Sequence, residues 1–179
     1  VTATAGQQVS LSLQNDNDTT SANAVLGTDT GTQLQYYNGS TWVNYTSGNV
    51  TIPAGGTLLV RVAVTQDTTY EGAETFQLAV KPTGGSAVYG TATILDDGTG
   101  DIYPNNNTGA KDPNASKDDD RPVRVNDISV NEGSPYAVFT VGGTSGQQIS
   151  LSLQNDNDPA TANAALGTDT GTPLQYYVA

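Results

Sequence analysis

A long internal repeat constrains the fold of this chain more than any other feature of its sequence. Residues 1–37 align with residues 141–177 at an offset of 140 positions, and 28 of the 37 aligned positions are identical. The run QQVSLSLQNDND recurs as QQISLSLQNDND. Similarity of this extent at a fixed spacing is the signature of a tandem array. We therefore expect a repeat of about 140 residues that is seen in a permuted register, starting within one copy and ending within the next.

Alternating apolar and polar residues predict short β-strands joined by turns, and no helix. The expected strands are 7–13, 57–65, 75–80, 87–95, 123–130 and 137–141. Within the second of these, the residues expected to point inward are Leu58, Val60, Val62 and Val64. Turn signals between the strands include Asn38-Gly39, Pro53 to Gly56 and Gly84-Gly85. This pattern is typical of an all-β, antiparallel β-sandwich.

Charge and composition exclude several classes of function. The chain of 179 residues carries 18 acidic and 6 basic residues, a net charge of −12, which is the wrong sign for binding nucleic acid. It has no cysteine and no histidine, so disulfides, thiolate metal sites and the commonest general base are absent, and we expect no enzyme. Only oxygen ligands remain for a metal, and these suit hard cations such as Ca²⁺. No apolar run approaches the length that membrane insertion requires.

Residues 99–122 form a segment rich in Asp, Asn, Pro and Gly that lacks apolar periodicity. This composition is typical of a linker, either disordered or held by an ion. We therefore expect three parts: a sandwich at 1–98 that lacks its first strand, a linker at 99–122, and the first strands of the next repeat at 123–179. Residues 123–141 are expected to complete a sandwich, either within the chain or on another copy.

Acidic residues are few and are concentrated at expected strand ends. The turn QDTTYEGAETF contains Asp67, Glu71 and Glu74, the strand 87–95 ends at Asp96 and Asp97, and Glu132 follows an opening strand. Strand-end turns from distant parts of a Greek-key sandwich converge at one pole, where packed carboxylates repel each other unless a cation bridges them. The alternative is that these side chains are solvated loop acids.

The ordered set of motifs ISVNEG, AVFTV, ISLSL, QDTTYEGAETFQL and GTATILDDG resembles the Calx-β domain. In particular, it is similar to the version repeated in large calcium-dependent adhesins that bacteria export by type 1 secretion. The resemblance implies a seven-stranded, immunoglobulin-like Greek-key sandwich with calcium at one end. The metal ligands that it implies are Glu132, Asp67, Glu71, Asp96 and Asp97. Asp29 and its copy Asp169 match less securely, and Glu74 matches a glutamate that is either a ligand or a structural residue. Separately, the run DDDRP lies upstream of the next repeat and can supply Asp118, Asp119 and Asp120 to an inter-repeat ion.

The function expected from this resemblance is that of a structural extender module in a secreted adhesin at the bacterial cell surface. Its partners would be neighbouring repeats or other copies of itself, and a host or surface glycan bound through the parent protein. One alternative is a self-assembling extracellular filament joined by strand complementation. Another is a glycan- or receptor-binding module that uses Tyr36, Tyr37, Trp42 and Tyr45. The motif Asn15 to Asp18 and its copy Asn155 to Asp158 are either a second ion loop or a polar turn.

Overall fold

A computed structural model describes residues 1–16, 19–105, 109–155 and 164–177, and within these ranges the chain is all-β with no helix. The order of elements is β1 (Gln8–Asn15), β2 (Ala22–Asn23), β3 (Gln35–Tyr37), β4 (Trp42–Asn44), β5 (Val50–Thr51), β6 (Val60–Arg61), β7 (Glu74–Pro82), β8 (Val88–Ile94), β9 (Arg124–Val125) and β10 (Val141–Gly142). The described residues contain no helical segment that is long and apolar enough to cross a lipid bilayer.

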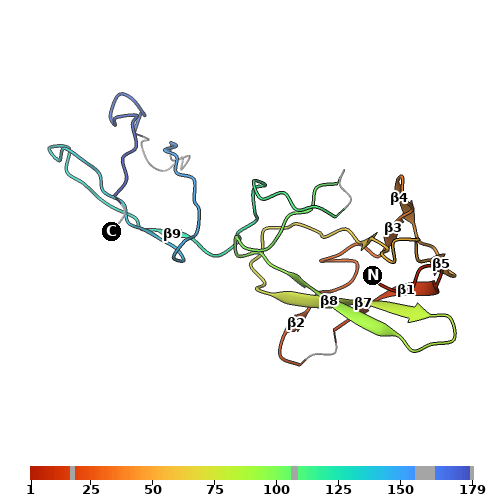
Figure 1. The fold of residues 1–179 in the computed structure, drawn as a ribbon. Helices are drawn as coiled ribbons and strands as arrows, with labels where there is room; N and C mark the ends of the chain where they lie inside the picture. Colours follow the sequence, from red (N-terminus) through yellow and green to blue (C-terminus); the bar gives the residue numbers. More distant parts are fainter. Residues whose placement is uncertain (17–18, 106–108, 156–163, 178–179) are drawn as a thin grey trace. The chain divides into compact units, whose positions relative to one another are not determined.

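The larger sheet has the strand order β5–β1–β7–β8, and all of these neighbours are antiparallel (Figure 1). β7 is central, because β1 pairs with it along one edge and β8 along the other. Its register with β8 runs from Glu74 opposite Ile94 to Val80 opposite Val88. The short strand β2 extends the β1 side of β7 in a parallel pairing. β8 therefore forms one outer strand of this sheet.

A second sheet has the order β4–β3–β6 and is antiparallel throughout. The turn between β3 and β4 follows directly from its sequence: Asn38 Oδ1 accepts the N–H groups of Ser40 and Thr41, and Gly39 takes a φ of 98°. Glycine populates this left-handed region without steric cost, whereas most residues do not. The predicted turn at Asn38-Gly39 is therefore confirmed.

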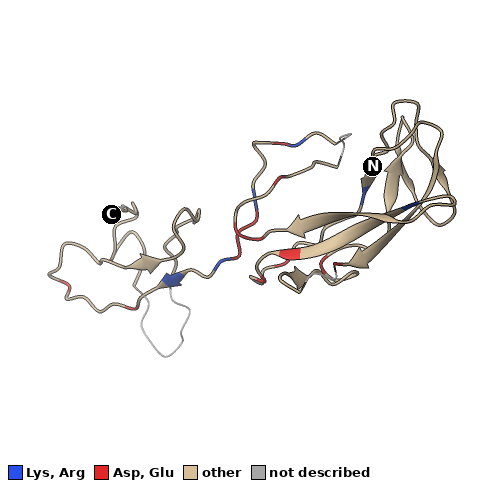
Figure 2. Ribbon diagram, turned by 60° about the horizontal axis from the view of Figure 1, so that its bottom comes forward, with Lys and Arg blue, Asp and Glu red and all other residues tan. Residues whose placement is uncertain are grey.

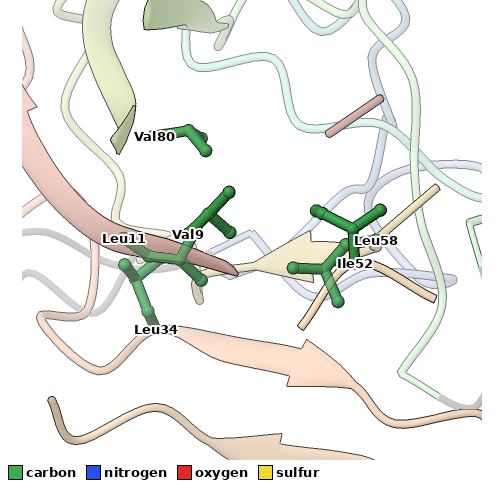
Figure 3. Packing of buried hydrophobic residues seen from close by; sticks show 6 residues of the cluster. All are labelled: Val9, Leu11, Leu34, Ile52, Leu58 and Val80. Atoms are coloured by element: carbon green, nitrogen blue, oxygen red, sulfur yellow. The ribbon is translucent and has the colours of Figure 1, made fainter. Parts of the chain in front are cut away.

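The core lies where side chains from β1 and β7 meet those from the second sheet and its flanking loops (Figure 3). Its buried members are Val9, Leu11, Leu34, Ile52, Leu58 and Val80. The alternation in β1 produces this burial, because residues two apart along a strand share one face. The predicted inward positions of Val9 and Leu11 are confirmed, at 1% and 5% exposed. The arrangement is an all-β architecture of antiparallel sheets, consistent with a β-sandwich.

Three of the strands expected from the sequence differ from those in the structure. Val64 was expected to point inward and is 59% exposed, because the second sheet narrows to a single bridge between Thr30 and Val64 at that level. The expected strands 123–130 and 137–141 shrink to β9 and β10, which pair only with each other. Within the described residues no third strand lies against this two-stranded ribbon, so little regular structure propagates from it.

The chain divides into two compact units, residues 1–147 and 148–179. The described part of the second unit contains a turn at Leu166 to Thr170 and no named strand. The domain boundaries expected at 98/99 and 122/123 stay predictions.

Candidate metal centre

Three carboxylates from two separate segments meet at one end of the larger sheet. Asp29 lies in a tight turn, Glu71 precedes β7, and Glu74 is the first residue of β7. One carboxylate oxygen from each of the three lies within 4.8 Å of the others. Asp29 is buried, at 7% exposed, Glu74 is partly buried and Glu71 is exposed. These three residues can hold a metal ion.

Asp29 is fixed by its own turn. Its Oδ2 accepts the Val25 N–H at 2.6 Å, and its N–H donates to the Val25 carbonyl at 3.0 Å. Gly27 closes the turn by donating to the Thr30 carbonyl. The turn thus positions Asp29 beside the start of β7, where β2 pairs with Glu74 and Thr75.

Proximity and burial of these carboxylates shift their ionisation. Burial, followed by the charges of Asp29 and Glu71, raises the pKa of Glu74 to about 7, and a hydrogen bond with the Asp29 carboxyl adds to the effect. Burial and then the charges of Asp29, Asp67 and Asp96 also raise the pKa of Glu71. Without a cation, full ionisation of the cluster is therefore disfavoured up to about neutral pH, because adjacent carboxylates repel each other.

Asp96 supplies an independent indication of a cation at this end. Its Oδ2 accepts the N–H groups of Glu71 at 2.7 Å and Gly72 at 3.3 Å, so it fixes the turn that carries Glu71. Its Oδ1 is buried and has no hydrogen-bond partner in the described structure. A buried carboxylate oxygen without a donor is costly, and a hard cation would satisfy it.

The linker returns to the same end of the sheet. Gly98 donates to the Asp118 carbonyl at 2.8 Å, Asp120 donates to the Asp96 carbonyl at 2.9 Å, and Asp97 and Asp119 form an antiparallel bridge. Acidic segments accordingly gather where β8 ends and the linker passes it (Figure 2). The backbone of the linker acids Asp118 to Asp120 is thus paired with the backbone at the end of β8, next to Asp96 and Asp97.

The three linker acids differ in their electrostatic surroundings. Asp119 receives a two-pronged contact from the Arg121 guanidinium, at 2.7 and 2.6 Å, which lowers the pKa of Asp119. Burial and then the charges of Asp118, Asp67 and Asp96 raise the pKa of Asp120. Asp119 is thus already neutralised by an arginine, whereas Asp120 belongs to the electronegative end that a cation would stabilise.

The remaining candidate ligands have local roles or lie elsewhere. Asp67 accepts the N–H of Thr69, and Asp97 accepts both the N–H and the hydroxyl of Thr99, which lowers the pKa of Asp97. Glu132 is exposed in the loop between β9 and β10, and Asp169 is exposed in the second copy of the Asp29 turn. Glu132 is not part of the Asp29 cluster, and Asp169 belongs to the second unit, residues 148–179.

The other ion-loop candidate is only partly described. Asp16 is buried at 8% exposed, and its Oδ1 accepts the Gln77 amide at 3.0 Å, which is a structural contact within the larger sheet. Residues 17–18 and the copy at 156–158 lie outside the described residues.

Two residues near the centre were not singled out from the sequence. Thr30 is fully buried, and its hydroxyl has no partner in the described structure. Nothing in the pattern GTDTG distinguishes this threonine from its neighbours. Arg121 neutralises Asp119, and the run DDDR could have signalled that pairing because a side chain two residues away reaches back easily.

The aromatic residues of the second sheet are engaged in packing. Arg61 lies over the Trp42 ring at 4.2 Å from its centroid, and the Tyr37 ring is 5.6 Å from Trp42. The Tyr45 hydroxyl donates to the Gly48 carbonyl and accepts the Leu11 N–H. These contacts account for Trp42 and Tyr45 as structural residues.

A scan against protein-family models and searches of curated proteins and of solved structures returned no match to this chain.

Proposed function

We propose that this chain is a calcium-braced structural module of a secreted, repetitive adhesin at the bacterial cell surface, with an immunoglobulin-like Greek-key fold. The observation that carries the proposal is the meeting of Asp29, Glu71 and Glu74 at one end of a sheet in a chain whose sequence repeats. A catalytic pair would need a cleft that frames a substrate. Carboxylates converging on one point suit a bound cation instead.

The ion would connect segments that lie far apart in the sequence. Asp29 anchors the long segment after β1, whereas Glu71 and Glu74 anchor the start of β7. Asp96 holds the Glu71 turn and also receives the linker through its carbonyl. A cation here therefore stiffens the junction between the sheet and residues 118–120. Stiff junctions between repeats suit a module whose task is to set reach, which a long array of repeats accomplishes.

Thermal unfolding of the full chain with and without calcium tests the proposal. An ion that binds only the folded state stabilises it by about 2.7 kcal/mol at a concentration 100 times its Kd. For a chain of this size, such a gain raises the midpoint by roughly 5–10 °C. We expect this rise with Ca²⁺ in excess over EGTA, and a smaller one with Mg²⁺, which demands a tighter octahedral set of ligands. A change of about a degree or less would contradict the calcium proposal.

A further inference from the structure

The turn between β3 and β4 contains the only asparagine of the chain that is followed by glycine, in the pair Asn38-Gly39. Residues Asn38 to Thr41 are all exposed. The side-chain carbonyl carbon of an asparagine is an electrophile, and the backbone nitrogen of the next residue is the nucleophile closest to it along the chain. Glycine presents that nitrogen with the least steric hindrance, because it has no side chain. The reactivity of this pair therefore depends on how the turn holds the two groups.

The turn polarises the side-chain carbonyl of Asn38. Its oxygen accepts the N–H of Ser40 at 3.0 Å and the N–H of Thr41 at 2.9 Å. A carbonyl oxygen has two lone pairs, so this one is fully engaged, and the amide nitrogen lies on the other side of the carbonyl carbon. Two N–H groups directed at one carbonyl oxygen stabilise the negative charge that develops on it when a nucleophile adds to the carbon.

The backbone nitrogen of Gly39 is available as the nucleophile. Among the described residues the Gly39 N–H has no hydrogen-bond partner, whereas Asn38 donates its own N–H to the Thr41 carbonyl at 3.1 Å. A Cβ added at Gly39 would meet no atom within 4 Å, so the surrounding space is open. The nitrogen can therefore approach the side-chain carbon without losing a backbone hydrogen bond.

Another turn of the same type shows the opposite arrangement. Asp97 Oδ1 accepts the N–H of Thr99 at 3.0 Å, and Gly98 takes a φ of 77°. Gly98, however, donates its N–H to the Asp118 carbonyl at 2.8 Å, so its nitrogen is held. The side chain before it is also a carboxylate, which resists nucleophilic attack when ionised. The reaction that is open at Asn38 is thus blocked at Asp97.

We propose that Asn38 is a site of spontaneous modification, at which Asn38-Gly39 converts to an aspartyl or isoaspartyl linkage. The Gly39 nitrogen attacks Cγ of Asn38, and the new C–N bond closes a succinimide ring. The bond from Cγ to Nδ2 breaks, and ammonia leaves with the proton that Gly39 has lost. Water then opens the ring at either carbonyl. One opening leaves an aspartate in an unchanged backbone, and the other carries the backbone through the side chain as isoaspartate.

The isoaspartyl product lengthens the backbone by one methylene group at the tip of the β3–β4 hairpin. It also removes the side-chain oxygen from the position that accepts two N–H groups of the turn. Tyr37 and Trp42 are paired directly beside this turn, and their rings are 5.6 Å apart. The aspartyl product keeps both the backbone and an acceptor oxygen. The two products therefore carry the same charge and differ in how well they hold the hairpin together.

Peptide mapping by mass spectrometry of the full chain, incubated near neutral and at mildly alkaline pH, tests the site. We expect Asn38 to lose ammonia and gain water at least about tenfold faster than Asn44 or Asn49, which are exposed asparagines followed by larger residues. The rate at Asn38 should rise several-fold per pH unit, because the attacking nitrogen must lose its proton. Equal rates at Asn38 and Asn44 would overturn the proposal.

Asn38→Gln is the matched control for this reaction. It keeps the side-chain amide but requires one further torsion to be fixed before the ring can close, so it should react at least about tenfold more slowly than the unaltered chain. An equal release of ammonia from the Asn38→Gln chain would place the reaction at another residue and contradict the proposal.

Comparison with the chain unfolded in guanidinium chloride tests the contribution of the turn. In the unfolded chain the reactivity of Asn38-Gly39 depends on sequence alone. We expect the folded chain to react at a rate within about tenfold of the unfolded one, because the turn leaves both reacting groups accessible to each other. A slower reaction than this in the folded chain would show that the turn protects Asn38, and would refute the proposal.

The effect on the hairpin is measured by comparing the purified isoaspartyl form with the Asn38→Asp variant. We expect thermal unfolding of the isoaspartyl form at a midpoint lower by roughly 2–4 °C, and a midpoint for Asn38→Asp close to that of the unaltered chain. The charge is the same in both, so the difference reports the altered backbone. Equal midpoints for the two forms would contradict the loosening of the hairpin.

Discussion

The Asp29 turn and its copy show which features a short sequence determines by itself. Asp29 accepts the Val25 N–H at 2.6 Å, and Asp169 accepts the Ala165 N–H at 2.8 Å. Gly27 and Gly167 take φ values of 96° and 87°, and each donates to the carbonyl of a threonine three residues on. The turn therefore forms with or without surrounding structure. Among the described residues, the aspartate of the first copy lies beside two glutamates because the start of β7 supplies Glu74 and the preceding turn supplies Glu71.

This pair of aspartates provides a matched test of the metal centre. Asp29→Asn keeps the turn acceptor and removes one charge from the cluster, so we expect the calcium-dependent rise in midpoint to fall by at least half. Asp169→Asn makes the same chemical change in the copy of the turn that belongs to the second unit, and should leave the rise unchanged. Thermal unfolding with Ca²⁺ and with EGTA would measure the two rises, and calorimetric titration with Ca²⁺ would measure the two affinities. A loss of affinity in Asp169→Asn equal to that in Asp29→Asn would contradict the placement of the ion.

Glu74 gives a pH dependence whose sign depends on calcium. Its pKa is about 7 in the folded chain and 4.5 in the absence of its surroundings. Between these values the folded state binds more protons than the unfolded state, so stability in EGTA falls as pH rises from about 4.5 to about 7. Calcium needs the ionised carboxylate, so its stabilisation should grow over the same interval.

Unfolding midpoints across that interval, with EGTA and with Ca²⁺, would measure this dependence. Glu74→Gln removes the titrating group and should flatten the fall seen in EGTA. A midpoint in EGTA that rises over this interval would show that Glu74 is not the controlling group.

At the scale of an element, β1 and its copy show how the surrounding structure decides whether the same sequence pattern forms a strand. Both contain SLSLQN, yet residues 8–15 form a strand and residues 148–155 form no named strand. The alternation correctly predicted which face of β1 is buried, and β7 and β8 were close to their expected ranges. The alternation could not show whether the second copy has a partner strand. The partner of β1 is β7, which lies in the sequence between the two copies and has no equivalent after the second copy within the given sequence. The expected strands at 123–130 and 137–141 shortened for the same reason.

Equivalent leucines make this difference measurable. Leu11 is 5% exposed and Leu151 is 47% exposed. We expect Leu11→Ala to destabilise the fold by about 2–4 kcal/mol, because it leaves a cavity in the core. Leu151→Ala should cost less than about 0.5 kcal/mol. Urea unfolding of the two variants would measure both values, and similar costs would mean that the second copy is packed as tightly as the first.

The candidate site was predictable in part, for a reason that the fold makes clear. Carboxylates at strand ends were expected to converge, and Glu71, Glu74 and Asp96 do gather at one end of the larger sheet. Glu132 was expected there because the resemblance places its strand in the same domain, but here that strand pairs within the β9–β10 ribbon. Sequence spacing indicates which acids lie at strand ends, but it does not show which strands pair, and Glu132 lies in the β9–β10 ribbon although it belongs to the same unit, residues 1–147, as the Asp29 cluster.

For the molecule as a whole, two segments held at opposite ends of the larger sheet matter most. Val1 to Ala3 pair with Gly56 to Leu58 at one end of the strands, and residues 118–120 are held at the other, beside Asp96 and Gly98. Tension applied between these points runs along the axes of β1, β7 and β8. The hydrogen bonds of their ladders are then loaded in shear, so they must yield together and cannot open one after another. The proposed role as an extender module would load the chain in this way, and an ion beside Asp96 would then reinforce the point where the load leaves the sheet.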